Sequence, residues 1–267
     1  GMVGPGSTPR TKFDVANYRD YLETRVERAV VDDNLTLELG LDITPQMLQA
    51  RDFDVVVLCT GGRPRTLPVP GIGGPHVVQA VALLSDPALA GGAKRVAVVG
   101  GGDVGCETAL FLARELGKEV TVIEMLPTLM KESCTANRGY LIHMLERAGV
   151  RLWNASYIER IDTDAVTVRR NVSPTVPSPT VTWAPVLPEN VVNPLAKPIR
   201  VDEETTVVEA DLIVLAVGMD PDTRLYEACV DRNVAPEVHV AGDAFSPGRI
   251  FEATKAGYAV GRTLGMV

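Results

Sequence analysis

The sequence predicts an α/β protein in which helices cover a mostly parallel sheet. Apolar runs of strand length alternate with helical segments along the 267 residues, and this alternation is typical of doubly wound folds. One strand–turn–helix–strand unit, residues 95–124, also carries a glycine-rich turn. No run reaches the roughly 18 apolar residues of a membrane-spanning helix. These observations indicate a globular chain built around a ligand-binding βαβ unit.

The unit at residues 95–124 is the clearest part of the prediction. Residues 95–99 and 120–123 are rich in Val, which is typical of buried parallel strands. Apolar residues at helical spacing lie between them until Gly117, a residue type that ends helices. The turn after the first strand consists of Gly100, Gly101, Gly102, Asp103, Val104 and Gly105.

This turn is a G-x-G-x-x-G motif in the context that makes it specific for a dinucleotide. Gly100 allows a tight turn, Gly102 lets the backbone approach a pyrophosphate, and Gly105 lets helix and strand pack closely. The helix start adds free N–H groups and a positive dipole end. The alternative is an ordinary glycine turn of a βαβ unit.

Glu124 follows the last glycine by 19 residues, at the end of the second strand, with Met125 beside it. A carboxylate there accepts hydrogen bonds from the adenosine ribose and repels a 2′-phosphate. No arginine lies between Met125 and Cys134, so NADH is favoured over NADPH.

The rest of the chain supplies elements on both sides of this unit. The proline-rich residues 63–71 indicate a stiff crossing between domains, and residues 171–201 indicate an irregular excursion that interrupts a hairpin. Before the unit we expect helices over 11–36, 45–50 (with Thr44 as N-cap) and 79–88, and strands over 35–39 and 54–60. After it we expect helices over 137–148 and 250–264, and strands over 150–161, 165–169, 205–208, 212–217 and 238–240.

Two buried strands share a design in which an apolar run ends in glycine. Thr60 and Gly61 follow one, and Val217 and Gly218 follow the other. Ligands of open α/β sheets bind beyond the carboxyl ends of the strands, so these pairs are candidates for lining a cofactor cleft. Simple strand-to-loop turns explain them equally well.

In the final helix, a face of small residues permits close packing on a sheet or cofactor.

Net charge and the spacing of cysteines and histidines limit the partners and the chemistry that we expect. The net charge of −8 argues against nucleic acid and anionic membranes as partners. The four cysteines form no C-x-x-C, which indicates no metal site and a reduced, cytoplasmic protein; Cys106 is expected to be a packing residue. The three histidines are isolated, so no catalytic residue is assigned.

Four segments together resemble the C-terminal half of the NADH:flavin oxidoreductases related to 2,4-dienoyl-CoA reductase and trimethylamine dehydrogenase. They are DVVVLCTGGRPRTLPVPGI (54–72), RVAVVGGGDVGCETALFLA (95–113), DLIVLAVGMDPDTRLY (211–226) and VHVAGDAFSPGRIFEATKAGYAVGR (238–262). The resemblance implies that Gly242 and Asp243 contact the ribityl or pyrophosphate region of FAD. The helix from Ile250 would point its N-terminus at that flavin.

The resemblance also implies the domain organisation. Residues 73–218 would form an inner, Rossmann-like nicotinamide-binding domain inserted in an incomplete outer FAD-type domain, 9–72 and 219–267. Residues 1–8 indicate a tag or flexible start. An FMN barrel, an iron–sulfur cluster and the first glycine motif for FAD lie outside this chain, so the chain is expected to be an inactive fragment with some self-association through open sheet edges.

Two other functions stay open. The chain could be a non-catalytic module that holds ADP in an amine-dehydrogenase-like enzyme, a branch that the long proline-rich excursion favours. A complete small reductase is the third hypothesis, and the absence of both a first glycine motif and a C-x-x-C argues against it.

Overall fold

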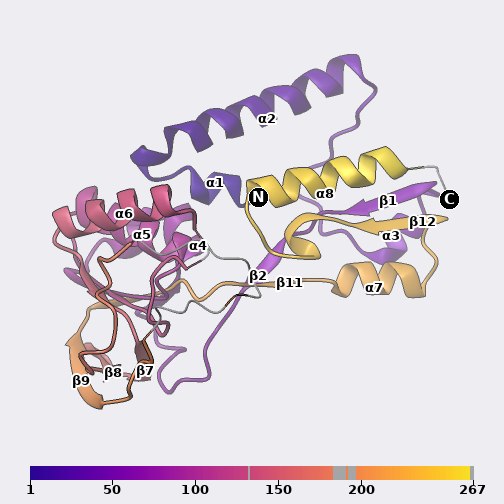
Figure 1. Ribbon diagram of the computed structural model, residues 1–267. Coiled ribbons are helices and arrows are strands. Elements are labelled where there is room, and N and C mark those ends of the chain that lie inside the picture. The colour runs from indigo at the N-terminus through magenta and orange to yellow at the C-terminus, as the bar shows by residue number, and fades with distance from the viewer. Residues whose placement is uncertain (132, 183–190, 192–196, 265–267) are drawn as a thin grey trace. The chain divides into compact units, whose positions relative to one another are not determined.

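The structure is a computed structural model that describes residues 1–131, 133–182, 191 and 197–264. The chain forms two compact units (Figure 1). Unit 1 comprises Gly1–Arg65 and Met219–Val267, and unit 2 comprises Thr66–Gly218, so unit 2 is inserted in the sequence of unit 1. The proline-containing residues 66–72, assigned from the sequence to the outer part, belong to unit 2, because Leu67, Val69 and Ile72 pack on its core.

The central sheet of unit 2 consists of β3 (Val77–Gln79), β4 (Arg95–Val99), β5 (Glu119–Ile123), β6 (Arg151–Trp153) and β10 (Leu212–Leu215). All neighbouring strands are parallel, in the order β3-β10-β4-β5-β6. The order reverses at β4, and ligands of doubly wound sheets bind at such a switch point. The sheet confirms the predicted α/β, Rossmann-like class.

Helices cover one face of this sheet. They are α4 (Ala80–Ser85), the 3₁₀ turn η2 (Pro87–Ala90), α5 (Asp103–Arg114) and α6 (Thr135–Arg147). Val98 and Val122 of the sheet and Leu112 of α5 have no exposed surface, and they share one apolar core. Because α5 buries Leu112 and Cys106 there, its first turn is held firmly at the end of β4.

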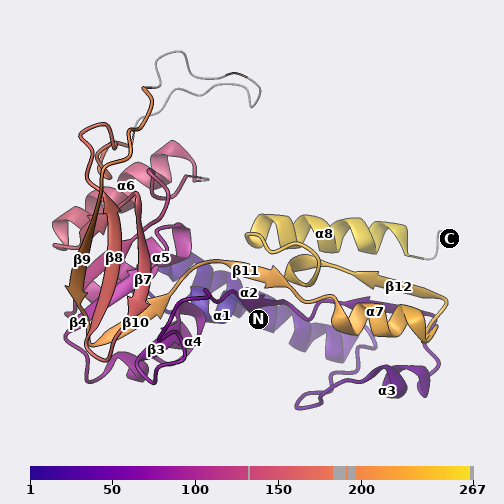
Figure 2. The ribbon, with the colours of Figure 1, turned by 90° about the horizontal axis from the view of Figure 1, so that it is seen from below.

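A three-stranded antiparallel sheet supplies the core on the other face. It consists of β7 (Ser156–Ile161), β8 (Ala165–Asn171) and β9 (Glu203–Glu209), which lie side by side in Figure 2. Val166 and Val168 of β8 are fully buried with Ile213 of the central sheet. Both faces of the parallel sheet are therefore covered, as its continuous apolar strands require.

Several predictions for unit 2 need correction. The stretch 150–161 is not one strand, because the chain leaves the central sheet after β6 and begins β7 in the second sheet. The helix expected over 79–88 is shorter, since Pro87 starts a separate turn and Gln79 ends the unpredicted β3. The excursion does interrupt a hairpin, as predicted, because Asn171 pairs with Glu203. Much of its middle lies outside the described residues.

Unit 1 has two separate two-stranded sheets. In one, β1 (Val55–Leu58) pairs in parallel with β12 (Glu237–Val240), and in the other, β2 (Gly62–Pro64) pairs antiparallel with β11 (Met219–Pro221). Two helices, α3 (Pro45–Gln49) and α7 (Arg224–Asp231), lie on one side of β1 and β12 (Figure 1). Among the described residues, the apolar cluster there has four buried members, Val56, Leu58, Cys229 and Val234.

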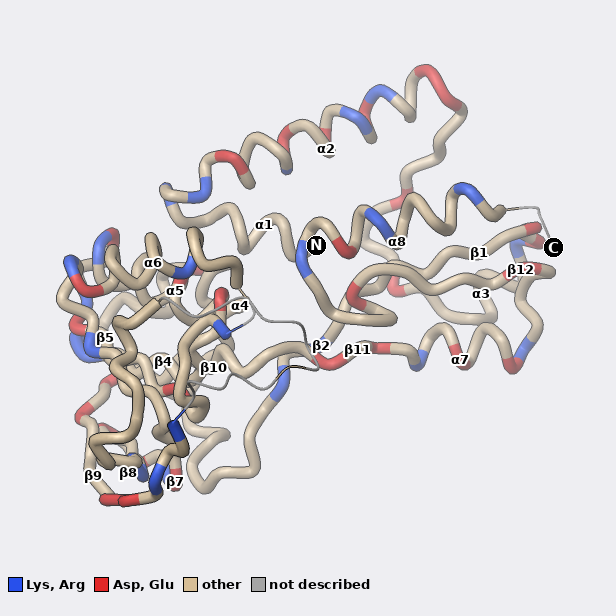
Figure 3. The backbone as a smooth tube through the Cα atoms, viewed as in Figure 1, with Lys and Arg blue, Asp and Glu red and all other residues tan. Residues whose placement is uncertain are grey.

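The remaining helices and helical turns of unit 1 contribute little to its core. They are α1 (Val3–Gly6), the turn η1 (Arg10–Lys12), α2 (Phe13–Asp32), the turn η3 (Gly242–Ala244) and α8 (Ile250–Thr263), and only η3 contains a buried residue, Ala244. Acidic and basic residues alternate along α2 (Figure 3), while Phe13 and Tyr21 are 62% and 56% exposed. The small-residue face expected to pack closely on α8 lacks such a contact, because a Cβ at Gly257 would meet nothing within 4 Å.

One prediction for the first part of the chain is wrong. Residues 35–39 form no strand, because no described strand pairs with them, and Leu37 and Leu39 are 50% and 79% exposed. Residues 1–8, predicted to be a tag or flexible start, include one turn of helix, Val3–Gly6, closed by backbone hydrogen bonds. By contrast, Thr44 caps α3 as predicted, accepting a hydrogen bond from the Met47 N–H.

Candidate dinucleotide site

The glycine turn leaves β4 at the switch point of the sheet, and steric constraints explain two of its glycines. Gly100 has φ +103°, and a Cβ there would lie 2.4 Å from the Ala216 carbonyl oxygen. A Cβ at Gly105 would lie 1.9 Å from the carbonyl oxygen of Gly100. Both approaches exclude any side chain, so β4, α5 and the chain after β10 meet at one tight point.

The other two glycines differ in what surrounds them. A Cβ at Gly101 would lie 2.9 Å from Cβ of Glu124 and 3.1 Å from the Leu129 side chain, so this position also requires glycine. Gly102 has nothing within 4 Å of its missing Cβ. The open side of the turn is therefore at Gly102, where the backbone is free to meet a ligand.

Glu124 is tied to the glycine turn by its carboxylate. One oxygen accepts from the Gly101 N–H at 2.6 Å, and the other accepts from the Leu126 N–H at 2.7 Å. The residue is 8% exposed, so these bonds replace most of its hydration. Each oxygen keeps a further lone pair, which is the acceptor a ribose hydroxyl would use. Glu124 thus braces the turn in addition to any role toward a ligand.

The loop after Glu124 folds back onto the turn. The Met130 N–H donates to the Gly101 carbonyl at 2.8 Å, and Leu129 is fully buried under it. Ser133 donates from its hydroxyl to the Asp103 carboxylate in the first turn of α5. Met125, by contrast, is 71% exposed at the carboxyl edge. The turn is therefore held from two sides by other residues of the chain.

Two buried side chains fasten this loop to the beginning of the proline-rich excursion. Arg138 donates to the carbonyls of Leu129 (2.9 Å), Val181 (3.0 Å) and Thr182 (3.1 Å). Burial lowers the pKa of its guanidinium below the usual range.

The amide of Asn154 acts in the same way. It donates to the Pro127 carbonyl at 2.6 Å and to the Pro177 carbonyl at 2.8 Å. Through these hydrogen bonds, Arg138 and Asn154 hold the described start of the excursion against the loop that follows Glu124. Sequence reasoning missed both residues, because neither belongs to a motif and each bridges segments far apart in the chain.

The predicted residues Val217 and Gly218 lie at the same edge. They follow β10, which neighbours β4, and the Ala216 N–H donates to the Val99 carbonyl at 2.8 Å. Gly218 has φ +99°, a turn that favours glycine. Unit 2 thus brings Gly100–Gly105, Glu124 and Val217–Gly218 together at the carboxyl ends of three adjacent strands.

The remaining predicted site residues belong to unit 1. Thr60 and Gly61 follow β1, and Gly242 and Asp243 follow the adjacent β12, so all four lie at one sheet edge. Asp243 accepts a hydrogen bond from the Gly248 N–H at 3.0 Å, just before Ile250 begins α8. Gly62, which the sequence analysis did not single out, is required there: a Cβ would lie 2.7 Å from the Asp220 carbonyl oxygen and 3.3 Å from that of Asp243.

The two units fit their expected cofactors to different extents. In unit 2 the N-cap of α5, Gly102, has no side-chain capping bond, so the first-turn N–H groups are offered to a pyrophosphate beside an open Cβ position. The residues present therefore fit the adenosine and pyrophosphate half of a nicotinamide dinucleotide. Unit 1 has Asp243 and the start of α8 but no second glycine cradle of this kind among the described residues, so it does not fit a whole FAD.

The Cys106 and His76 side chains have packing or structural contacts here. Cys106 is fully buried and donates to the Gly101 carbonyl, and burial raises the pKa of its thiol far above the usual range. His143 is exposed on α6, and His76 contacts the Asp162 carbonyl. Among the described residues no cluster of His, Cys, Asp and Glu is suited to a metal, and no helix is long and apolar enough to cross a membrane.

Comparison with known proteins decides the family. The family model for pyridine nucleotide-disulphide oxidoreductases matches residues 15–256. The chain belongs to this family. It is 26% identical to an NADH oxidase of Thermoanaerobacter brockii and 28% identical to a bilirubin reductase of Mediterraneibacter gnavus, covering 97% and 99% of this chain and 35% of each relative.

A solved structure of 2-naphthoyl-CoA reductase is also similar, with a TM-score of 0.75 and 25% sequence identity over 97% of this chain and 34% of that one. The chain therefore spans about a third of the length of these relatives. Membership of the family implies an oxidoreductase domain that works with FAD and NAD(P)H.

Proposed function

We propose that this chain is the NADH-docking part of a flavin-dependent oxidoreductase related to the 2,4-dienoyl-CoA reductase and trimethylamine dehydrogenase group. One observation carries the proposal. The glycine turn at the switch point is preformed, with Gly102 open and Glu124 bonded to Gly101 beside it. A dinucleotide laid along this edge would place its pyrophosphate at α5 and its adenosine ribose toward β5.

The residues of this chain bind and orient the cofactor. The first turn of α5 holds the pyrophosphate through N–H groups and its dipole. Glu124 accepts from the ribose hydroxyls with its remaining lone pairs and repels a 2′-phosphate, which favours NADH. Bound reduced nicotinamide supplies hydride chemistry, and a flavin is the acceptor in this class of enzyme. No acid or base of this chain is needed for that transfer.

The proposal extends to the whole enzyme. Electrons would leave the flavin for a catalytic domain, with FMN and an iron–sulfur cluster, that is not among these 267 residues. The match to about a third of each relative supports this view. Asp243 and the start of α8 would then contact an FAD whose other half-site is supplied elsewhere. The isolated chain would be inactive, cytoplasmic and prone to some self-association.

One observation favours a second function, an ADP-holding structural module. Every feature that unit 2 builds around the turn serves the adenosine and pyrophosphate half of a ligand, which NADH and ADP share. The fold of the nucleotide site does not by itself require a nicotinamide.

Calorimetric titration of the chain with NADH, NADPH and ADP separates these functions. We expect NADH to bind most tightly and NADPH about tenfold more weakly, since a phosphate beside the buried Glu124 carboxylate costs about 1.4 kcal/mol or more. Equal affinities for ADP and NADH would support the structural module. Tighter binding of NADPH than of NADH would contradict the role given to Glu124.

A further inference from the structure

An arginine ends the core-facing side of β8 at the ligand edge of unit 2. Side chains alternate along a strand, so Val166, Val168 and Arg170 share the face that packs on the central sheet. The two valines are fully buried, whereas Arg170 is half-buried. Partly burying an ionic side chain at the end of an apolar stripe costs free energy. The groups around Arg170 therefore indicate its role.

Arg170 contacts an aromatic face, and no carboxylate among the described residues pairs with it. Its guanidinium lies 4.0 Å from the centre of the Trp153 ring. Its Nε is buried and has no hydrogen-bond partner in the part of the chain that the structure describes. Glu204 is its register partner on β9, yet no ion pair joins the two described side chains. The guanidinium plane therefore rests on Trp153, and no ion pair with a described residue holds the side chain in another position.

The pair lies next to the end of β5. The Glu124 N–H donates to the Trp153 carbonyl at 2.7 Å, and the Ser156 N–H donates to the Glu124 carbonyl at 2.8 Å. Ser156 is the register partner of Arg170. Trp153 thus ends β6, the strand next to β5 on going outward across the central sheet, and Arg170 reaches its ring from β8 of the three-stranded sheet.

The order of groups in a dinucleotide matches this order of residues. With the pyrophosphate at α5 beside β4 and the ribose at Glu124 on β5, the adenine continues outward over the end of β6. Arginine planes stack on bases as well as on aromatic rings. We propose that Arg170, backed by Trp153, is the platform on which the adenine ring of the dinucleotide stacks; this inference rests on the proposed function.

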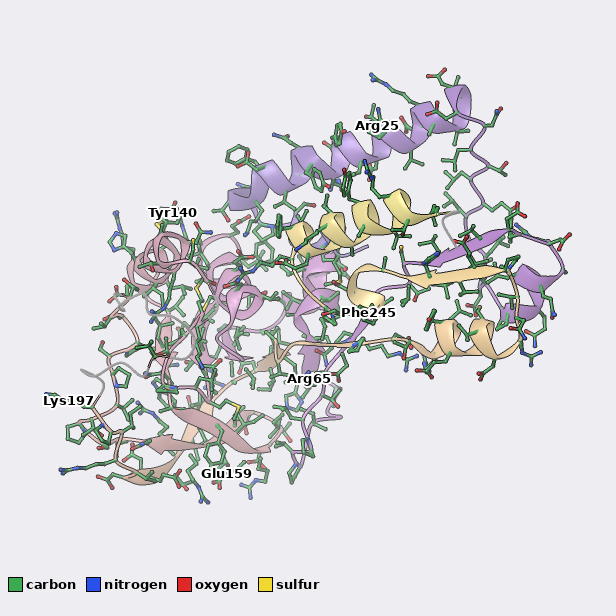
Figure 4. The ribbon with its side chains drawn as sticks, turned by 45° about the vertical axis from the view of Figure 1, so that its right-hand side comes forward. Arg25, Arg65, Tyr140, Glu159, Lys197 and Phe245 are labelled. Carbon is green, nitrogen blue, oxygen red and sulfur yellow. The ribbon has the colours of Figure 1, made fainter. Side chains whose placement is uncertain are left out.

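The neighbouring residue provides a matched control. Arg169 points to the opposite face of the same strand, where it lies 5.9 Å from the Tyr157 ring centre. It pairs with Glu159, which Figure 4 labels, and with Glu203. Arg169 therefore has the same side chain, the same strand and a similar aromatic contact, but its charge is already neutralised and it faces away from the proposed adenine.

The test is titration of the full chain with NADH, ADP and NADPH in four forms: wild type, Arg170→Ala, Arg170→Met and Arg169→Ala. Loss of a base-stacking partner weakens binding about 5- to 30-fold. We expect that loss for both NADH and ADP in each Arg170 variant, because both ligands carry adenine. The Arg169 variant should stay within about twofold of wild type. Arg170→Met keeps apolar contact with Trp153, so it reports on affinity even if the alanine variant unfolds.

Lysine at position 170 distinguishes stacking from charge alone. Lysine keeps the charge but lacks the planar face, so Arg170→Lys should bind NADH as weakly as Arg170→Ala. If Arg170→Lys restores binding, or if only NADPH is affected, Arg170 is a phosphate ligand and the adenine platform is wrong. If wild type binds NADH and every Arg170 variant binds it equally well, the inference fails while the proposed function stands. Absence of NADH and ADP binding by wild type would overturn both.

Discussion

Unit 2 and unit 1 both contain parallel strands, yet only unit 2 buries them on both faces. Its five-stranded sheet lies between helices and a three-stranded sheet, with Val98 and Val214 completely buried. In unit 1, β1 and β12 form a parallel pair over four buried side chains, and Val57 is 41% exposed. Parallel sheets are rarely stable unless both faces are covered, and two strands are too few for independent stability.

The difference shows where the chain can hold a ligand by itself. The glycine turn of unit 2 is fixed by the sheet, by Glu124 and by the loop around Leu129. Asp243 of unit 1 sits after a strand whose sheet offers little support, and Phe245 nearby is 65% exposed (Figure 4). We therefore infer a preformed nucleotide site in unit 2 and an incomplete flavin-facing part in unit 1.

Hydrogen exchange should show the largest difference between the units. The β4 and β10 amides, such as those of Val98 and Val214, should exchange only through global unfolding, whereas α8 amides should exchange through local opening. The ratio of protection factors should reach about 10³ or more, the factor for about 4 kcal/mol. Equal protection of α8 and β4, measured by mass spectrometry or NMR, would contradict the comparison.

A matched pair of glycine substitutions, one in each unit, tests the same comparison. Gly105→Ala forces a Cβ against the Gly100 carbonyl at 1.9 Å and should lower the free energy of unfolding by about 3 kcal/mol and abolish NADH binding. Gly257→Ala in α8 meets nothing within 4 Å and should stabilise by about 0.5 to 1 kcal/mol. Urea unfolding and titration measure both. A tolerated Gly105→Ala would show that the turn is not tightly packed.

The buried arginine of unit 2 can be compared with an exposed one of unit 1. Arg138→Ala leaves the Leu129 and Thr182 carbonyls without their donor and should cost about 2 kcal/mol in unfolding free energy. It should also weaken NADH binding, because the loop beside Glu124 loses its support.

Arg51 pairs with Glu38 at the surface, where both are 41% exposed, so Arg51→Ala should cost less than about 0.5 kcal/mol. Chemical denaturation of the two variants under one set of conditions provides the measurement. Equal losses of unfolding free energy in the two variants would show that burial of Arg138 does not increase its contribution to stability.

The smallest expected effect is on the pH dependence of stability. The Arg95 guanidinium, with the Arg95 and Lys94 N–H groups, holds the pKa of the Asp211 carboxyl well below its usual range. Because that pKa is lower in the folded state, the stabilisation is present at neutral pH and is lost as the pH falls below the ordinary carboxyl value.

Asp211→Asn should therefore reduce the fall in melting temperature between pH 7 and pH 3. Arg51 also lowers the pKa of Glu38, but in unit 1 and with both groups exposed, so Glu38→Gln should change the profile less. Thermal melts across this pH range give the comparison. An unchanged profile for Asp211→Asn would exclude a stabilising role for the Arg95 pair.

Much of unit 2 was predictable because local chemistry and tertiary structure agree there. The strand at 95–99 and the helix after the glycine turn follow from apolar spacing, and Gly105 is needed for the close packing that its motif indicates. Short strands such as β2 and β3 were missed, because three residues give no periodic signal.

Other features depend on partners that sequence patterns do not show. Alternating leucines at 35–39 predicted a strand, but no described strand pairs with them. Glu124 was expected to face only the ribose, and its bond to the Gly101 N–H depends on how the turn folds back. Arg138 and Arg170 lie in separate elements and meet the site only through tertiary packing.

The most direct test of the central claim is a hydrogen-exchange footprint of NADH on the full chain. We expect added protection at Gly100–Gly105, at Glu124 and Leu126, and at Val217–Gly218, all within unit 2. Protection confined to unit 1, or none at saturating NADH, would contradict the claim that unit 2 carries a preformed dinucleotide site.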